Sequence, residues 1–373
     1  MSQSIIMAAP CQLGVEGLAA GELRRMGAAN VAAENGRVLF EGDEAMLARA
    51  NLCSRYAERI CVVMGRFEAR TFDELFEGTK ALPWEDWIGK SDAFPVKGSA
   101  LNSQLHSVPD CQKIIKKAIV NRLSRRYGLN WFEETGALHR VQFLIMKNRV
   151  LLMIDTSGAS LHKRGYRRNG SAAPIRETLA AAMTDIAFVR RDTHVIDPCC
   201  GSGTILIEAG LKALNVAPGL RRSFVAEGWR NLPPSVWQAE RTRARDLINR
   251  DAGFSACGYD IDPAVIALAK ENAYKAGMAN RITFEQRDVK DFVPDGEKGA
   301  VVCNPPYGER LLDVESARRI YAVMGERFVP RDGWSYAVIT PDDRFEAFFG
   351  RPCSKQRKLY NGMLQCRLYL YHS

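Results

Sequence analysis

A short apolar strand followed by a glycine turn and a helix constrains the fold of this chain more than any other feature. His194 to Asp197 has strand character, Gly201-Ser202-Gly203-Thr204 forms the turn, and a helical run continues to Leu214. Such a turn brings backbone N–H groups close to a ligand at a helix N-terminus, as in Rossmann-type folds. The turn lacks the Gly-Lys-Ser/Thr ending of a phosphate loop, and the Asp197 carboxylate would repel a pyrophosphate. We therefore expect an α/β domain whose ligand carries an ammonium group at this position.

Two further strands end at acidic residues. Ala256 to Asp260 precedes a helix that begins at Pro263, and Ile282 to Arg287 is followed by Asp288. One carboxylate can accept both hydroxyls of a ribose, and the other can meet the amino group of an adenine. With Asp197 beside an amino-acid moiety, the pattern indicates S-adenosylmethionine. The predicted cofactor-binding residues are Asp197, Gly201, Ser202, Gly203, Thr204, Asp260, Ile261, Asp288, Val289 and Asn304.

A fourth strand runs from Val301 into Asn304-Pro305-Pro306-Tyr307. Two prolines cannot continue a β-ladder, because neither has an N–H to donate, so the strand ends at Asn304. The amide and the backbone carbonyls can accept hydrogen bonds from an amino group, and the tyrosine ring can stack on a planar base. Taken alone, the four residues are equally well a proline-rich turn with a buried tyrosine. Beside a methyl donor, we predict that Asn304, Pro305, Pro306 and Tyr307 are the catalytic residues.

Length and composition restrict the class of protein. A chain of 373 residues is long enough for two or three domains, and 46% hydrophobic with 25% charged residues is typical of soluble globular proteins. We find no apolar run of about 18 residues and no signal sequence, which predicts a cytoplasmic protein without a membrane partner. The ten cysteines show no zinc spacing, so we expect reduced thiols and no metal.

The first half of the chain reads as binding or scaffolding domains. Residues 1–65 follow a β-α-β-β-α-β pattern with a hairpin at Asn35-Gly36, which predicts a ferredoxin-like unit, and residues 66–156 form a second unit. Residues 157–190 read as a linker and leading helix, and 191–373 as the catalytic domain. The net charge of +9 is concentrated in two clusters. We predict RNA contacts, with Tyr166 stacking on a base, although a solvated helix face and a plain linker are the alternatives. The residues concerned are Lys113, Lys116, Lys117, Lys163, Arg164, Tyr166 and Arg167.

The second acid lies much further beyond the glycine turn than the roughly 20 residues of a simple Rossmann unit. Residues 216–253, rich in proline and arginine and containing Phe224, Trp229 and Trp237, therefore read as an insertion. A lid, a further RNA contact and a packed structural elaboration all remain open for this segment.

The motifs 197–204, 258–262 and 304–310, with 164–167 and 174–179 upstream, resemble those of bacterial large-subunit (23S) rRNA guanine-N2 methyltransferases of the RlmL/YpsC type. The resemblance covers the whole chain. It implies a ferredoxin-like domain, an RNA-binding THUMP domain over 66–156, and a class I Rossmann-like methyltransferase domain with a seven-stranded, mostly parallel sheet. Longer members carry a second methyltransferase domain, so the resemblance implies only the guanine-N2 activity here. The implied partner is structured RNA, either large-subunit rRNA or a ribosome precursor.

Other functions fit the same residues. Asn304 and its neighbours would serve any planar amino group, so adenine-N6 methylation of DNA or RNA and methylation of a protein glutamine are chemical rivals. A non-catalytic RNA-binding assembly factor with a vestigial pocket is the alternative from another class. The intact acids and glycines argue against that alternative, and the basic N-terminal half favours RNA over a protein.

Overall fold

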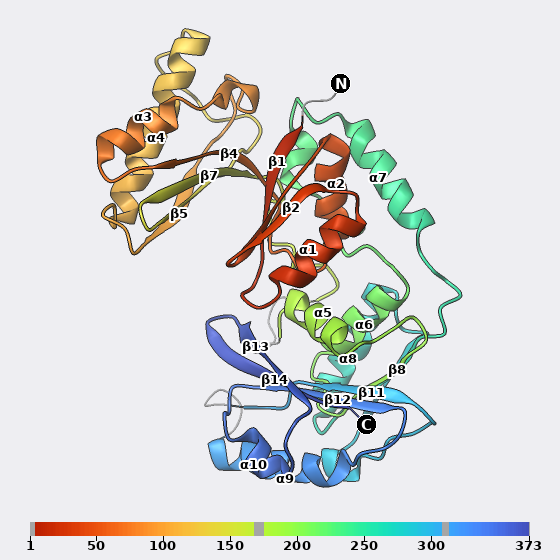
Figure 1. Ribbon diagram of the computed structural model, residues 1–373. Coiled ribbons are helices and arrows are strands. Elements are labelled where there is room, and N and C mark those ends of the chain that lie inside the picture. The colour runs from red at the N-terminus through yellow and green to blue at the C-terminus, as the bar shows by residue number, and fades with distance from the viewer. Residues whose placement is uncertain (1–3, 168–174, 308–312, 373) are drawn as a thin grey trace.

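The computed structural model describes residues 4–167, 175–307 and 313–372, which contain two seven-stranded sheets with helices packed on them (Figure 1). Parts of two quoted motifs, namely Pro174 and Gly308 to Arg310, lie outside the described residues. None of the described helices is both long enough and apolar enough to cross a membrane.

The first sheet is shared by the ferredoxin-like unit and the second unit. Its strands follow the order β2-β3-β1-β4-β7-β6-β5. Only β5 and β6 are parallel among the paired neighbours. The strands are β1 (Ile5–Pro10), β2 (Ala29–Glu34), β3 (Arg37–Gly42), β4 (Cys61–Glu68), β5 (Val96–Leu101), β6 (Val141–Met146) and β7 (Arg149–Asp155). The helices are α1 (Glu16–Arg25), α2 (Glu44–Cys53), α3 (Phe72–Lys80) and α4 (Val108–Tyr127).

Local sequence signals explain several of these elements. Gly36 has a positive φ of 72° in the two-residue turn between β2 and β3, as the Asn-Gly pair predicts. The Asp43 side chain caps α2 by accepting the Met46 N–H at 2.8 Å, and Thr71 and Glu74 form a capping box at α3. The two predicted units are joined edge to edge, because β4 pairs with β7 from Cys61↔Asp155 to Glu68↔Arg149.

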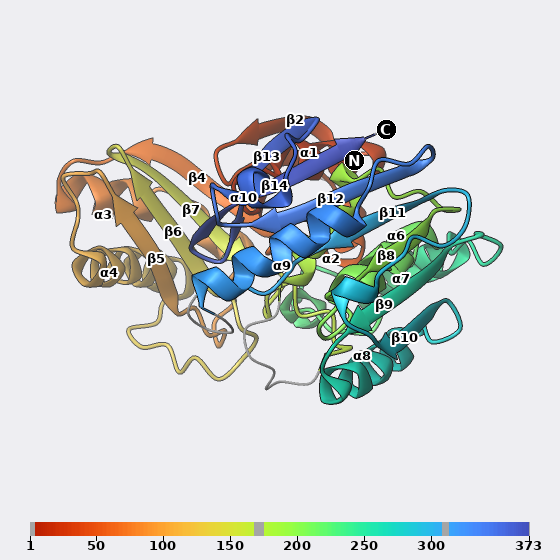
Figure 2. The same ribbon diagram turned by 90° about the horizontal axis from the view of Figure 1, so that it is seen from below.

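The second sheet has the order β10-β9-β8-β11-β12-β14-β13, and β14 is antiparallel to both of its neighbours. This arrangement confirms the predicted mostly parallel sheet with a closing hairpin. The strands are β8 (His194–Asp197), β9 (Ser255–Asp260), β10 (Ile282–Gln286), β11 (Gly299–Cys303), β12 (Trp334–Thr340), β13 (Lys355–Asn361) and β14 (Leu364–His372). The helices are α5 (Glu177–Ile186), α6 (Thr204–Ala213), α7 (Pro234–Asp246), α8 (Pro263–Ala276), α9 (Val314–Arg327) and α10 (Phe345–Phe349). Seen from below, α9 and α10 lie on one face of the sheet, while α6 and α8 lie on the other (Figure 2).

Residues 216–253 pack against the N-terminal half. Helix α7 lies along α2, where Arg49 and Glu240 form a bidentate ion pair with N–O distances of 2.9 and 2.6 Å. The Trp229 indole stacks on His139 at a centroid distance of 4.3 Å and donates to the Leu138 carbonyl at 3.0 Å. Trp237 stacks on Phe224 at 5.4 Å. All three aromatic side chains of the insertion are buried, so the structure favours the packed elaboration among the three roles considered.

Candidate active site

Four polar side chains lie along one edge of the second sheet. Strands β10, β9, β8 and β11 are consecutive neighbours and run in the same direction, so their carboxyl ends share that edge. In this order they carry Asp288, Asp260, Asp197 and Asn304. Adjacent strands are about 4.8 Å apart, so a single ligand can span all four. The fold therefore brings the predicted cofactor and catalytic residues together.

The glycine turn between β8 and α6 is shaped for a close approach. Gly201 and Gly203 both have positive φ, at 52° and 79°, where other residues are strained. A Cβ on Gly203 would lie 2.9 Å from the Phe284 ring, whereas a Cβ on Gly201 would meet no described atom within 4 Å. Gly203 therefore lets the turn pack on the sheet, while Gly201 faces open space that a ligand can fill.

Asp197 is a buried carboxyl, and one of its oxygens has no hydrogen-bond partner among the described residues. Its Oδ1 accepts the Cys199 N–H at 3.1 Å, but Oδ2 makes no hydrogen bond of normal geometry with the described residues. Burial raises the pKa of Asp197 to about 8; the Cys199 N–H and the neighbouring Cys303 thiol lower it, and the charge of Asp260 raises it further. A cationic group at Oδ2 would stabilise the ionised form.

The two other acids already accept hydrogen bonds from backbone N–H groups. Asp260 accepts the Gly201 N–H at 3.0 Å and the Asp262 N–H at 3.1 Å, one on each oxygen. Asp288 accepts the Lys290 N–H at 3.0 Å as the N-cap of a short 3-10 helix that contains Val289. Because a carboxylate offers about four acceptor positions, both acids keep capacity for a ligand. Ile261, next to Asp260, is 66% exposed and offers an apolar surface at the same edge.

The strand β11 ends at Cys303, and Asn304 follows with its Oδ1 buried and without a hydrogen bond to any described residue. Pro305 is buried, while Pro306 and Tyr307 are half-buried. The Tyr307 hydroxyl accepts a hydrogen bond from Asn361 Nδ2 at 2.9 Å, and burial raises the pKa of the phenol, so the group stays neutral. An acceptor without a donor among the described residues therefore lies close in sequence to an aromatic ring held by a hydrogen bond.

Comparison with known proteins identifies the family. Residues 164–369 match the model of an RMKL-like methyltransferase domain, residues 7–61 that of an RlmL ferredoxin-like domain, and residues 69–155 that of a THUMP domain. The chain belongs to the RlmL/YpsC-type RNA methyltransferases.

Curated relatives of the RlmL/YpsC type support this assignment. The chain is 44% identical to a putative RNA methyltransferase, YpsC, of Bacillus subtilis, over 99% of this chain and 96% of that protein. It is 36% identical to the ribosomal RNA large subunit methyltransferase K/L of Syntrophotalea carbinolica, over 95% of this chain. The chain spans about half the length of that K/L relative, 52% of which is covered.

Two solved structures of similar proteins match almost the whole chain. One, from Listeria monocytogenes, is described as a predicted N6-adenine-specific DNA methylase; it is 48% identical with a TM-score of 0.93, covering 99% of this chain and 96% of that one. The other, the putative methyltransferase SMU.472 in complex with S-adenosylhomocysteine, is 38% identical with a TM-score of 0.94, covering 100% and 99%.

S-adenosylmethionine is the cofactor of this RlmL/YpsC-type domain. The geometry fits it. The open oxygen of Asp197 suits the ammonium group of its methionine moiety, and the space above Gly201 leaves room for the ligand backbone. Among the described residues, no three His, Cys, Asp or Glu side chains are grouped to hold a metal ion.

The structure corrects part of the predicted RNA surface. Tyr166 is buried and donates to Glu208 at 3.0 Å, and Arg164 is buried, with an ion pair to the same carboxylate at 3.5 Å. Neither side chain is accessible to a base or a phosphate. The Arg167 guanidinium is held by Glu177 at 3.1 Å and the Ile175 carbonyl at 3.0 Å. The polar, glycine-containing composition of this segment predicts an exposed linker. It does not reveal the burial of Arg164, because that burial depends on a carboxylate far along the chain.

The remaining predicted cations differ in availability. Lys116 is tied to Glu134, donates to the Phe94 carbonyl at 3.1 Å and lies 3.5 Å from the centre of the Phe94 ring. Lys113 has a side chain that is 79% exposed, and Lys117 and Lys163 are also exposed. The surface open to phosphate is therefore narrower than the sequence predicts.

Two supporting residues escaped the sequence analysis. Asn272 of α8 is buried and donates to the Ser202 carbonyl at 3.0 Å, which ties α8 to the glycine turn. Asn361, at the end of β13, orients Tyr307 from 54 residues away. In the sequence, Asn272 interrupts an otherwise apolar face of its helix, and this pattern could have indicated a supporting role. No local pattern marks Asn361.

Proposed function

We propose that the chain methylates the exocyclic N2 of a guanine in large-subunit ribosomal RNA. The observation that carries the proposal is the buried Asn304 Oδ1, which has no hydrogen-bond partner among the described residues and adjoins the cofactor edge. The K/L relatives are named as large-subunit ribosomal RNA methyltransferases, which supports the RNA. The choice of guanine rests on the resemblance of the motifs to guanine-N2 enzymes.

When bound, S-adenosylmethionine supplies an electrophilic methyl group on a sulfonium. The exocyclic nitrogen of guanine is a poor nucleophile, because its lone pair is delocalised into the ring. Asn304 Oδ1 and the Pro305 carbonyl would each accept one of its N–H bonds, which directs the lone pair toward the methyl donor. The same two acceptors stabilise the positive charge that develops on nitrogen. Holding the acceptor in this position is the main contribution required of the protein.

Tyr307 would supply the platform for the target base. An N2 amino group in a stacked helix is out of reach of a pocket at a sheet edge, so the base must leave its stack. The Asn361 amide fixes the phenol ring in place, which lowers the entropy lost when a base stacks on it. The nitrogen can release its proton to solvent after transfer, so no general base is assigned.

Adenine-N6 methylation is the second candidate, because the Listeria relative is described as a predicted adenine-specific DNA methylase. Both bases present an exocyclic amino group to the same acceptors. The THUMP match favours RNA over DNA, and the exposed Lys113 and Lys117 are available to the phosphates of either. We also propose the boundaries 1–65, 66–156, 157–190 and 191–373 as functional divisions of the chain.

The test is mass spectrometry of nucleosides from large-subunit RNA of cells with and without the gene. We expect one N2-methylguanosine to disappear and to return on complementation with the wild-type gene. Loss of an N6-methyladenosine instead would overturn the assignment of the base.

The Asn304→Ala variant tests the site directly. It should lower turnover by at least 100-fold, in line with loss of a transition-state acceptor, while the Kd for S-adenosylhomocysteine changes little. Calorimetry and a single-turnover assay separate the two effects. An active Asn304→Ala enzyme would contradict the proposed mechanism.

A further inference from the structure

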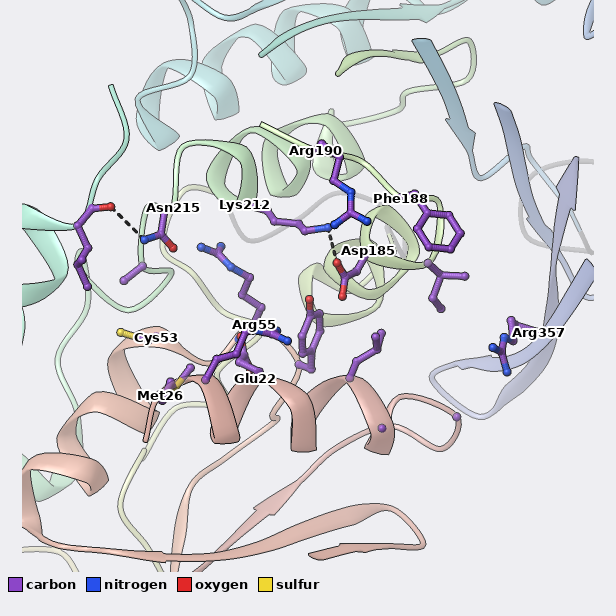
Figure 3. Close-up of a pocket in the computed structure, with 18 of the residues that line it drawn as sticks. Glu22, Met26, Cys53, Arg55, Asp185, Phe188, Arg190, Lys212, Asn215 and Arg357 are labelled. Carbon is purple, nitrogen blue, oxygen red and sulfur yellow. Dashed lines mark hydrogen bonds and ion pairs between the residues drawn. The ribbon is translucent and has the colours of Figure 1, made fainter. Parts of the chain in front are cut away.

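A cavity lies on the side of the methyltransferase sheet opposite the cofactor edge. It has a volume of about 900 Å³ and is enclosed by α1, the segment after α2, the carboxyl ends of α5, α6 and α7, and the start of β13 (Figure 3). Arg190 precedes β8 and Lys355 begins β13, whereas the cofactor residues follow their strands. This basic cleft is therefore separate from the methyl-transfer site.

The lining of the basic cleft is strongly cationic. Its two carboxylates are already engaged. Glu22 accepts the Ser54 hydroxyl at 2.8 Å and the Arg55 N–H at 2.9 Å, and Asp185 pairs with Lys212. The seven cations are Arg25, Arg55, Arg190, Lys212, Arg243, Lys355 and Arg357. Lys212 pairs with Asp185 and Arg243 Nη1 lies 3.7 Å from Glu240, so the other five cations are the ones without an ion pair among the described residues.

Arg55 is the most informative of these cations. Its side chain lies between α1 and the carboxyl end of α6 in Figure 3, and the residue is only 8% exposed. Nη2 donates to the Leu211 and Val216 carbonyls at 3.2 and 3.0 Å. Arg55 lines the cleft, and its Nη1 is buried without a hydrogen bond to any described residue. A buried guanidinium donor without a partner is costly, and an anion is the partner that it suits best.

The rim of the basic cleft carries exposed cations that lack an ion-pair partner among the described residues. Arg25, Arg190, Lys355 and Arg357 form no ion pair within the described part of the chain. Arg25 belongs to the N-terminal half, and the other three belong to the methyltransferase half. Lys355 and Arg357 are two residues apart on a strand, so they point to the same face. An anion in the cleft would contact both halves of the molecule.

We infer that the basic cleft binds phosphate groups. The spread of cations over several elements suits a ligand with more than one phosphate, and the volume suits a segment of nucleotide size. A phosphodiester backbone and a free polyphosphate share this chemistry. The inference does not depend on which base the enzyme methylates.

The experiment measures binding of two probes to the full-length protein. Inorganic tripolyphosphate is titrated by calorimetry, and a fluorescein-labelled RNA hairpin by anisotropy over a range of salt concentrations. The test variant carries Lys355→Glu and Arg357→Glu, which change only exposed side chains. A single charge reversal away from the cleft, Lys270→Glu on the exposed face of α8, serves as the control. Arg55→Lys keeps the positive charge but removes the planar guanidinium and its several N–H donors. This variant tests the contribution of the buried Arg55 donor, and its thermal unfolding is compared with that of wild type.

We expect wild type and Lys270→Glu to bind tripolyphosphate, and the double variant to lose at least tenfold in affinity. If the cleft receives RNA, the hairpin loses affinity as well, and its salt slope falls by about two. Unchanged hairpin affinity would identify a site for free polyphosphate. Equal tripolyphosphate affinity in wild type and the double variant, or no binding by wild type, would overturn the inference, and the cations would then merely protect an edge strand.

Discussion

At the scale of single residues, Asp197 couples the catalytic edge to pH. Its pKa is raised to about 8 chiefly by burial, whereas a carboxyl in an unfolded chain ionises near pH 4. Between about pH 4 and 8 the folded state holds a proton that the unfolded state has lost. Stability of the free protein should therefore fall as pH rises through this window.

An ammonium group beside Asp197 favours the carboxylate, so the affinity for S-adenosylhomocysteine should rise between pH 6 and 8. We expect the affinity to increase at least tenfold between pH 6 and 8. While the carboxyl of the free protein is protonated, the affinity can rise by up to tenfold for each pH unit. Calorimetry at several pH values checks this, with Asp197→Asn as the control that should bind weakly and show little pH dependence. A pH-independent wild type would show that another group holds the ammonium.

In the proposed mechanism Asn361 acts on the target base only through Tyr307, with which it shares a 2.9 Å hydrogen bond. Replacing Asn361 with Ala should lower kcat about fivefold, equivalent to about 1 kcal/mol, without changing cofactor affinity. Single-turnover rates of Asn361→Ala, Tyr307→Phe and the double variant form the test. Because both changes break one bond, the double variant should be no slower than the slower single variant; additive losses would mean separate roles.

At the scale of elements, residues 216–253 join the two halves of the molecule. Trp229 is 2% exposed and stacks on His139, whereas Trp131 is 79% exposed. Trp229→Ala should lower the free energy of unfolding by about 3 kcal/mol, because it empties a packed site. Trp131→Ala should change it by less than about 0.5 kcal/mol. Urea denaturation compares the two, and equal effects would show that the insertion packs weakly.

Elements with a strong local signal were predicted well. The Asn-Gly turn, the Asp43 cap and the proline-stopped β11 each depend on neighbours within a few residues, and all three occur where expected. The linker was predicted less well. Burial of Arg164 and Tyr166 depends on Glu208, 44 and 42 residues further along, and polar composition near a glycine does not reveal such a partner.

At the scale of the whole molecule, the ferredoxin-like and THUMP-matched segments share one sheet through the β4–β7 pairing. The two segments should therefore open together rather than as separate domains. In hydrogen exchange followed by mass spectrometry, we expect peptides from β1, β4 and β7 to show similar protection. Much faster exchange across β5, β6 and β7 together would indicate that the second unit opens independently.

The α/β class of the second sheet and its cofactor edge follow from local motifs, whereas the order of its seven strands is set by pairing between distant segments. Glycines, strand-ending acids and the Asn-Pro-Pro-Tyr stop act over short distances, so the sequence alone determined the α/β class, the cofactor edge and the candidate acceptor Asn304. Tertiary structure alone decided which cations remain free, which asparagine holds Tyr307, and where the basic cleft opens. Each of these depends on pairing between residues far apart in the chain, and such pairing leaves no periodic trace in the sequence.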